Sequence, residues 1–303
     1  MTANPYASFL PPGRRSAAGL EPQETWWNWR GHKVHIARAR RPELSVRVLV
    51  IHGAGGHSGA LWPLAALLAE RGLDVAAVDL PLYGRTTSPR PGAVRYDDWV
   101  ELLIDFVDAE DDERPLILFG ASIGGMLAYE VAARSGRAMT VAATCLLDPR
   151  DWRVRAHLTR FGPLGILAGP LATLARGRIE TAMVPMRWVA PLSMMSRNPG
   201  LSQLCANDSL GGGVAVPVGF LASYMHYRHV PPESMRTPVL LLHPSLDAWT
   251  PVELSMRVLR RLASPGRVVM LRECGHFPIE EPGITDLVTA VLALAQSSSN
   301  PDS

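Results

Sequence analysis

Short apolar runs alternate with helical patterns from Trp26 onward, and this alternation constrains the fold more than any other feature of the sequence. It is typical of a mostly parallel, twisted sheet that is flanked by helices. The predicted strands are 26–29 and 33–37, which form an antiparallel start, then 46–51, 75–80, 116–119, 140–147, 239–243 and 267–271. The predicted helices are 61–71, 96–109, 122–135, 252–262 and 284–295. The sequence therefore predicts an α/β fold.

The alternation breaks down after Asp148 and resumes after about Met235. The stretch between them is rich in Gly, Pro, Met and Leu and contains helical fragments but no clear strand. We expect residues 151–235 to form a helical cap, inserted into a core made of residues 21–150 and 236–297. Residues 1–20 would form an N-terminal extension and 298–303 a disordered tail. With 303 residues, 47% of them apolar, the chain can bury one large core with an insertion.

Charge and cysteine content exclude several classes of protein. The formal charge is +2, from 30 basic and 28 acidic residues without a long block of like charge, so we expect no nucleic acid partner. Cys145, Cys205 and Cys274 are too few and too scattered for a disulfide framework or a zinc cluster. The N-terminus lacks a secretory apolar region, and glycines and prolines interrupt the most apolar stretch, 161–175. We expect a soluble, cytoplasmic protein.

Residues 120–124 read Gly-Ala-Ser-Ile-Gly and fit the pattern G-x-S-x-G. They lie between a short apolar strand and an alanine-rich helix, which is the context that this nucleophile motif requires. A sharp turn there needs small flanking residues, and it places Ser122 where the helix N-terminus favours a developing anion. A plain serine N-cap is the alternative. We predict that Ser122 is a nucleophile.

A glycine-rich loop follows the predicted strand 46–51, where a second oxyanion donor belongs in this type of fold. The backbone N-H groups of Ala54 and Ile123 would converge on the developing oxyanion. A flexible glycine turn is the alternative. The loop's two histidines lack a third ligand at metal-binding spacing, so we expect them to brace the loop. The supporting loop residues are His52, Gly53, Gly55 and His57.

A serine hydroxyl needs a base, and His276 is the best candidate among nine histidines because it begins the loop after the last predicted strand. The acid that orients it must come from a strand-end loop between Ser122 and His276. Asp247 fits, one strand before the histidine loop, and Asp148 is its rival. His243, at a strand end near Asp247, is a possible supporting residue.

The predicted cap carries two histidines and many apolar side chains. His226 and His229 are spaced to share one helical face, and we interpret them as cap or pocket-lining residues. Flexible methionines adapt to acyl chains of different shape, which suggests a lipophilic pocket between cap and core. Packing of the cap on the sheet explains the same composition equally well. The apolar residues are Ile166, Leu167, Met183, Met186, Trp188, Met194 and Met195.

With these residues identified, the sequence resembles α/β-hydrolases, and within them the monoacylglycerol lipase, lysophospholipase and carboxylesterase group. The run H-G-A-G-x-H-S-G that is typical of the group appears at residues 52–59. The resemblance covers residues 26–295 but is poor through the cap. It implies the same nucleophile, acid, base and oxyanion donors. Ala121 stands where the group usually has histidine, and residues 79–84 look more like general esterases, so glycerolipid specificity does not follow.

Together these features predict a serine hydrolase that cleaves a carboxylic ester of a fairly apolar acyl group through an acyl-enzyme, without cofactor or metal. Monoacylglycerols and lysophospholipids are candidate substrates, and the cap is a candidate for transient contact with a membrane surface. The same triad serves acyltransferases, thioesterases, lactonases and carbon–carbon bond hydrolases, which stay open as alternatives. A non-catalytic ligand-binding protein of this fold is the rival from another class.

Overall fold

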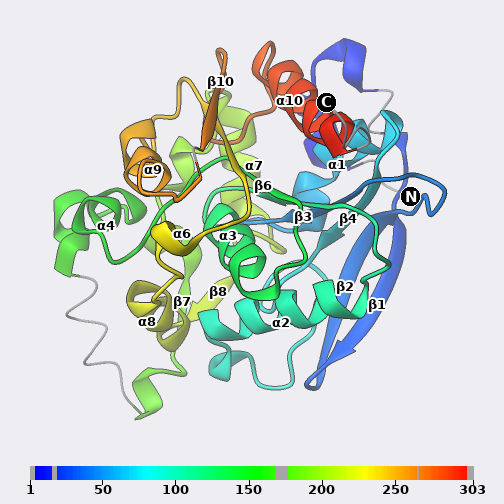
Figure 1. Ribbon diagram of the computed structural model, residues 1–303. Helices are drawn as coiled ribbons and strands as arrows, with labels where there is room; N and C mark the ends of the chain where they lie inside the picture. Colours follow the sequence, from blue (N-terminus) through cyan, green and yellow to red (C-terminus); the bar gives the residue numbers. More distant parts are fainter. Residues whose placement is uncertain (1–3, 16–18, 168–176, 265, 299–303) are drawn as a thin grey trace.

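The structure, a computed structural model, describes residues 4–15, 19–167, 177–264 and 266–298. An eight-stranded sheet crosses the molecule in the order β1-β2-β4-β3-β5-β6-β9-β10 (Figure 1). β2 pairs antiparallel with β1 and β4, and the other neighbours pair in parallel. The strands are β1 (Gln23–Trp29), β2 (His32–Ala39), β3 (Arg47–Ile51), β4 (Asp74–Val78), β5 (Leu116–Gly120), β6 (Thr140–Ala143), β9 (Val239–Pro244) and β10 (Arg267–Leu271).

Helices cover both faces of this sheet and bury an apolar cluster on each. α1 and α10 pack over one face, and α2, α3 and α9 over the other. The predicted mostly parallel sheet with flanking helices is confirmed. The bounds of these helices are α1 (Ser58–Glu70), α2 (Tyr96–Ala109), α3 (Gly124–Ser135), α9 (Val252–Leu259) and α10 (Gly283–Ser298).

Among the predicted elements that are shorter in the structure, two are shortened at the nucleophile turn. The helix predicted over 122–135 begins at Gly124, because Ser122 has a φ of 55°, which an α-helix cannot contain. The strand predicted over 140–147 ends at Ala143, where its pairing with β5 and β9 stops. The Thr144 amide still donates to the Gly120 carbonyl oxygen over 3.0 Å, and the Thr144 hydroxyl accepts a hydrogen bond from the Ser122 amide.

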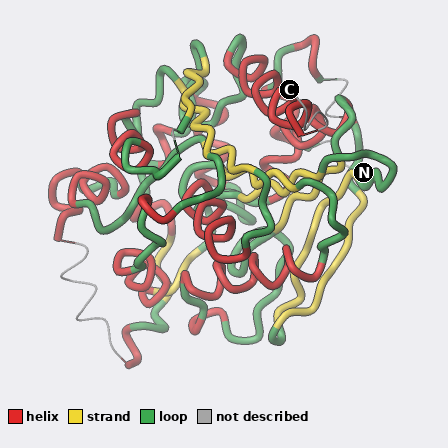
Figure 2. The backbone as a smooth tube through the Cα atoms, viewed as in Figure 1, coloured by secondary structure: helices red, strands yellow, loops and turns green. Residues whose placement is uncertain are grey.

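The segment predicted as a cap, 151–235, is built from short pieces, and Figure 2 shows most of it as loops and short helices. The expectation that it lacks strands is wrong, because β7 (Met183–Pro185) and β8 (Ala215–Pro217) pair antiparallel as a separate small sheet. The short helices are α4 (Trp152–Leu158), α6 (Met186–Val189), α7 (Pro199–Asn207) and α8 (Val218–His226). None of the helices in the described ranges is long and apolar enough to cross a membrane. The predicted disordered tail lies outside the described residues, apart from Ser298 at the end of α10.

The strand order explains where the predicted site residues meet. From β3 the chain moves outward to β4 and then returns to β5 on the other side of β3. Ligands of open α/β sheets bind at such a switch point, outside the carboxyl ends of the strands. Ile51 at the end of β3 pairs with Gly120 at the end of β5. The glycine-rich loop and the serine turn therefore start side by side.

Candidate active site

Ser122 lies in a strained turn between β5 and α3, with a φ of 55° in the left-handed region. Its amide donates to Thr144 Oγ1 over 2.8 Å. A Cβ on Gly120 would lie 2.2 Å from the carbonyl oxygen of Gly124, and a Cβ on Gly124 would lie 2.5 Å from that of Ile51. The flanking glycines are therefore required for this turn, which holds the serine at the edge of the sheet.

Ser122, His276 and Asp247 form one chain of hydrogen bonds. Ser122 Oγ lies 2.9 Å from His276 Nε2, and His276 Nδ1 lies 2.8 Å from Asp247 Oδ2. The three residues come from the loops after β5, β10 and β9, at the carboxyl edge of the sheet. The geometry is that of a nucleophile, a base and an acid that orients the base.

Asp247 is buried but well supplied with hydrogen bonds. Its Oδ1 accepts from the amides of Trp249 and Thr250, both over 2.8 Å, and its Oδ2 accepts from Thr250 Oγ1 over 2.7 Å. Burial alone raises the pKa of Asp247, but the charge of His276 and these hydrogen bonds outweigh it and lower the pKa to about 2. The ionised carboxylate favours the proton on His276 Nδ1, which leaves Nε2 to accept from the serine.

The rival acid lies elsewhere. Asp148 pairs with Arg150 over 3.1 Å, and its contacts within the described residues do not include His276. His243, the possible supporting residue, is buried with its Nδ1 3.1 Å from the carbonyl oxygen of Thr144. The pKa of His243 is lowered, mainly by burial. His243 thus donates to the residue whose hydroxyl holds the Ser122 amide.

The glycine-rich loop after β3 closes on the serine turn. A Cβ on Gly53 would lie 2.9 Å from the carbonyl oxygen of Ala121 and 3.3 Å from the amide nitrogen of Ile123, so only glycine allows this approach. Among the described residues, the amides of Ala54 and Ile123 donate to no backbone acceptor. Both N-H groups therefore remain available to an anion beside Ser122.

The two loop histidines tie this loop to its surroundings. His52 lies with Nδ1 2.7 Å from the Gly53 carbonyl oxygen, and its Nε2 accepts from the Leu80 amide over 3.0 Å. Burial lowers the pKa of His52 to about 4, which keeps the ring neutral for this acceptor role. His57 Nε2 lies 2.8 Å from Asp208 Oδ2, in the predicted cap. These contacts agree with a bracing role for both side chains.

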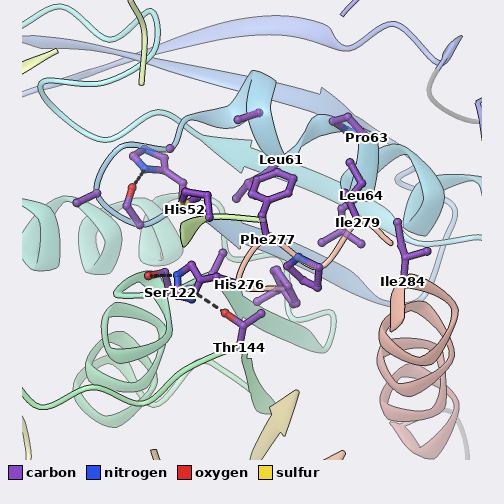
Figure 3. A pocket seen from close by; sticks show the side chains of 18 of the residues that line it. His52, Leu61, Pro63, Leu64, Ser122, Thr144, His276, Phe277, Ile279 and Ile284 are labelled. Carbon is purple, nitrogen blue, oxygen red and sulfur yellow. Dashed lines mark hydrogen bonds between the residues drawn. The ribbon is translucent and has the colours of Figure 1, made fainter. Parts of the chain in front are cut away.

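A cavity of about 50 Å³ opens beside Ser122 and His276. Figure 3 shows its apolar end, where side chains from α1, the loop after β10 and the start of α10 come together. The position of these side chains beside the serine suits an apolar substituent of a substrate. The apolar residues of this wall are Leu61, Pro63, Leu64, Phe277, Ile279 and Ile284.

Four of the seven apolar cap residues predicted for a lipophilic pocket do not line this cavity. Of the apolar residues predicted to form it, Met195 lines the cavity, and Met186 is buried in the core. Three others are exposed at the surface. They are Met183, Trp188 and Met194, exposed by 44%, 57% and 38%. The side chains of Ile166 and Leu167 lie outside the described part of the chain.

The cap histidines also lie away from the cavity. α8 ends at His226, so His226 and His229 do not share one helical face, and that expectation is wrong. His226 is exposed with its Nδ1 2.8 Å from the Ala222 carbonyl oxygen. His229 is buried with its Nε2 3.2 Å from the hydroxyl of Tyr96, and burial lowers its pKa to about 4. Neither residue lines the cavity beside Ser122.

Ligand atoms of Cys145, Asp247 and His276 lie within 4.8 Å of one another, a spacing that a metal ion could bridge. The chemistry of this set does not fit a metal. The aspartate and the histidine are hydrogen-bonded to each other, and burial raises the pKa of Cys145 to about 12, which keeps its thiol protonated. Cys145, Cys205 and Cys274 are all buried and free.

Comparison with known proteins identifies the family of this chain. The sequence model of a family described as "Alpha/beta hydrolase family" matches residues 48–285, from β3 to the first turn of α10. The chain belongs to the alpha/beta hydrolase family. The predicted fold and the predicted family are therefore both confirmed.

Solved structures with the same fold include two monoacylglycerol lipases. The enzyme of Paleococcus ferrophilus is 24% identical with a TM-score of 0.68, and the match covers 87% of this chain and 98% of that one. A soluble variant of monoglyceride lipase from Saccharomyces cerevisiae, in complex with a substrate analog, is 16% identical with a TM-score of 0.74, covering 91% and 96%. The enol-lactonase of Burkholderia xenovorans LB400 is 14% identical with a TM-score of 0.62, covering 90% and 100%.

A curated relative matches a smaller part of this alpha/beta hydrolase. The uncharacterized protein YfhR of Escherichia coli (strain K12) is 34% identical over 92 residues, which is 30% of this chain. The matched part spans about a third, 32%, of the length of YfhR. Together, the comparisons show the family and the fold, and they leave the substrate to be argued from the site.

Three residues that support the candidate triad were missed by sequence reasoning. Thr144 holds the Ser122 amide, Thr250 donates to Asp247, and the Trp249 ring lies 4.6 Å from the His276 ring between centroids. Thr250 had a local signal, because an aspartate three residues before a threonine readily accepts from the following backbone amides. Thr144 and Trp249 had none, since their roles depend on contacts across the sheet edge.

Proposed function

We propose that this alpha/beta hydrolase is a serine hydrolase that cleaves carboxylic esters of fairly apolar acyl groups through an acyl-enzyme. The observation that carries the proposal is the 2.9 Å contact between Ser122 Oγ and His276 Nε2 at the wall of a mainly apolar cavity. The fold shared with two monoacylglycerol lipases supports a lipid-like substrate, with monoacylglycerols and lysophospholipids as candidates.

In the first half of the reaction, Ser122 Oγ attacks the ester carbonyl carbon while His276 Nε2 takes its proton. Asp247 stabilises the imidazolium through Nδ1 but does not itself accept a proton. When the tetrahedral intermediate collapses, the bond between the carbonyl carbon and the alcohol oxygen breaks. His276 returns its proton to that oxygen, and the alcohol leaves.

In the second half, water replaces the alcohol. The water oxygen attacks the acyl carbon of the Ser122 ester while His276 takes a proton from that water. His276 then returns the proton to Ser122 Oγ as the carboxylic acid leaves. Both halves pass through an oxyanion. We assign its stabilisation to the N-H groups of Ala54 and Ile123, each worth about 3 to 4 kcal/mol of barrier lowering.

The test is hydrolysis of p-nitrophenyl esters from acetate to palmitate, with Ser122→Ala as the blank. Turnover that depends on Ser122 and peaks at an intermediate chain length is the expected result. Equal release of p-nitrophenol by both proteins overturns the assignment of Ser122. Turnover of thioesters or lactones but not of carboxylic esters would favour those alternatives, which use the same acyl-enzyme.

We propose that residues 151–235 act as a cap and touch lipid surfaces transiently. Large apolar side chains on this segment point outward, including Phe161 at 58%, Leu164 at 69% and Trp188 at 57% exposure. Such exposed groups favour partition into a lipid interface. Sedimentation with phosphatidylcholine vesicles tests this, and equal binding of the wild type and a triple Phe161→Ser, Leu164→Ser, Trp188→Ser variant contradicts it.

A further inference from the structure

Tyr6 joins the N-terminal segment to the predicted oxyanion loop and to the predicted cap. Its side chain is 1% exposed, although it belongs to a segment that precedes the sheet. The hydroxyl donates to Asp208 Oδ2 over 2.6 Å. The same carboxylate oxygen lies 2.8 Å from His57 Nε2. One partly buried carboxylate thus links three segments that lie far apart in the sequence.

The ring of Tyr6 also touches the loop that carries His276. It stacks on Phe277 with centroids 6.1 Å apart and planes at 29°, and it meets the His57 ring edge-on at 5.9 Å. Phe277 directly follows His276 and lines the cavity. Tyr6 is therefore in contact with both loops that the proposed mechanism uses.

Neighbouring hydrogen bonds fix the position of Tyr6 and of its acceptor. Asn4 accepts from the Tyr6 amide over 2.9 Å and donates to the Gly59 carbonyl oxygen over 2.8 Å. Burial raises the pKa of Asp208, but hydrogen bonds from His57 and Tyr6 outweigh it and lower the pKa to about 2. The acceptor is thus ionised at neutral pH, and a hydrogen bond to an ionised group is stronger than one between neutral groups.

We infer that Tyr6 is a positioning residue for the proposed ester hydrolysis. It holds the loop of Ala54, through Asp208 and His57, in register with the loop of His276. The inference rests on the proposed function. Tyr6 does not line the cavity, so its loss should leave substrate binding intact. The oxyanion amide acts in the transition state, and small misplacements there reduce kcat.

The experiment compares Tyr6→Phe and Tyr6→Leu with the wild type on p-nitrophenyl butyrate, at a temperature where all proteins are folded. Tyr6→Phe should lower kcat about 10-fold and Tyr6→Leu about 100-fold, with KM changed less than about 2-fold. Tyr129→Phe is the matched control, because its buried hydroxyl donates to the Val230 carbonyl oxygen over 3.0 Å. Tyr129→Phe should lower Tm by about as much as Tyr6→Phe does but should keep the wild-type kcat.

Tyr6 variants that lose Tm but keep the wild-type kcat overturn the inference, since a purely structural tyrosine behaves that way. A rise in KM of about 10-fold or more in the Tyr6 variants, with kcat unchanged, overturns the inference as well. If Ser122→Ala abolishes turnover while the Tyr6 variants keep kcat, this inference alone fails. If the wild type and Ser122→Ala are equally inactive on all esters, the proposed function fails and the inference falls with it.

Discussion

Two buried histidine–aspartate pairs in this protein are built alike but differ in what the second ring nitrogen meets. His276 Nδ1 lies 2.8 Å from Asp247, and His35 Nδ1 lies 2.7 Å from Asp79. Each aspartate also accepts from two backbone amides, and in both the pKa is lowered to about 2 against the effect of burial. The hydrogen bonds that each aspartate accepts are therefore not what distinguishes the two pairs.

The second nitrogen distinguishes them. His276 Nε2 faces the hydroxyl of Ser122 at an apolar cavity, whereas His35 Nε2 is bonded to the carboxylate of Glu24. Burial lowers the pKa of His35, but the two carboxylates outweigh it and raise the pKa above its ordinary value. Two carboxylates thus favour the cationic form of His35, whereas His276 faces one carboxylate and the hydroxyl of Ser122.

Removing the group at the second nitrogen should separate the pairs most strongly. Ser122→Ala removes the nucleophile, and kcat for p-nitrophenyl butyrate should fall by about 10⁴ to 10⁶. Glu24→Gln removes the charge beside His35 and should keep kcat within about 2-fold, because no reacting atom is near it. Steady-state kinetics of both variants measure this. A comparable loss of kcat in Glu24→Gln would break the comparison.

Neutralising the two aspartates should have the next largest effect. Asp247→Asn favours the wrong tautomer of His276, so kcat should fall by about 10⁴ while Ser122 stays in place. Asp79→Asn should lower Tm and lower kcat by no more than about 10-fold, since it removes an ion pair beside the loop of Ser58 but touches no residue of the candidate triad. Kinetics and thermal unfolding of the two variants test this together. Equal kcat in both would show that Asp247 has no special role.

The cavity beside His276 should respond to a smaller change. Leu64→Ala shortens a side chain in the apolar wall and so enlarges the cavity. The ratio of kcat/KM for the octanoate ester to that for the butyrate ester should therefore rise by about 10-fold. Val268→Ala, at a half-exposed residue of β10, is the control and should keep the ratio. An unchanged ratio in Leu64→Ala would mean that the acyl group does not bind between α1 and α10.

The pH dependence of stability should give the smallest effect. The pKa of His35 is raised by folding, so its stabilising contribution is fully present below its unfolded value near 6.5 and is lost as the pH rises through the raised pKa. The free energy of unfolding should therefore fall with pH above 6.5 in the wild type and less steeply in His35→Gln. Urea unfolding at successive pH values measures this, with His226→Gln as the exposed control. Parallel curves for all three proteins would contradict it.

Features with a local cause could be predicted closely. α2 and β10 have the predicted bounds, because side-chain periodicity over consecutive residues defines an amphipathic helix or a strand. The error at β6 has a non-local cause. Residues 144–147 are as apolar as a strand requires, but the pairing with β5 and β9 stops at Ala143, and the hydroxyl of Thr144 accepts from the Ser122 amide.

The residues of the candidate site also differ in whether they can be found from local sequence or only from the structure. G-x-S-x-G between a strand and a helix, and the histidine after the last strand, can be found from spacing alone. The sequence favoured Asp247 over Asp148, but both follow core strands, and the hydrogen bond of Asp247 to His276 is a distance that only the structure gives. Tyr6 had no signal, since nothing near it in the sequence indicates that Asp208 lies within 2.6 Å of its hydroxyl.

By itself, the sequence determined the fold class, the family and the order of the candidate nucleophile, acid and base, because these depend on periodicity and short motifs. Only the tertiary structure decided that the cavity lies against α1 and α10, where Met195 is the one methionine of residues 151–235 that lines it among the described residues. It also decided that a second buried histidine–aspartate pair, His35 and Asp79, meets a further carboxylate, that of Glu24. The reason is physical: a cavity and a hydrogen-bond partner depend on which distant segments fold against each other, and composition does not encode that locally.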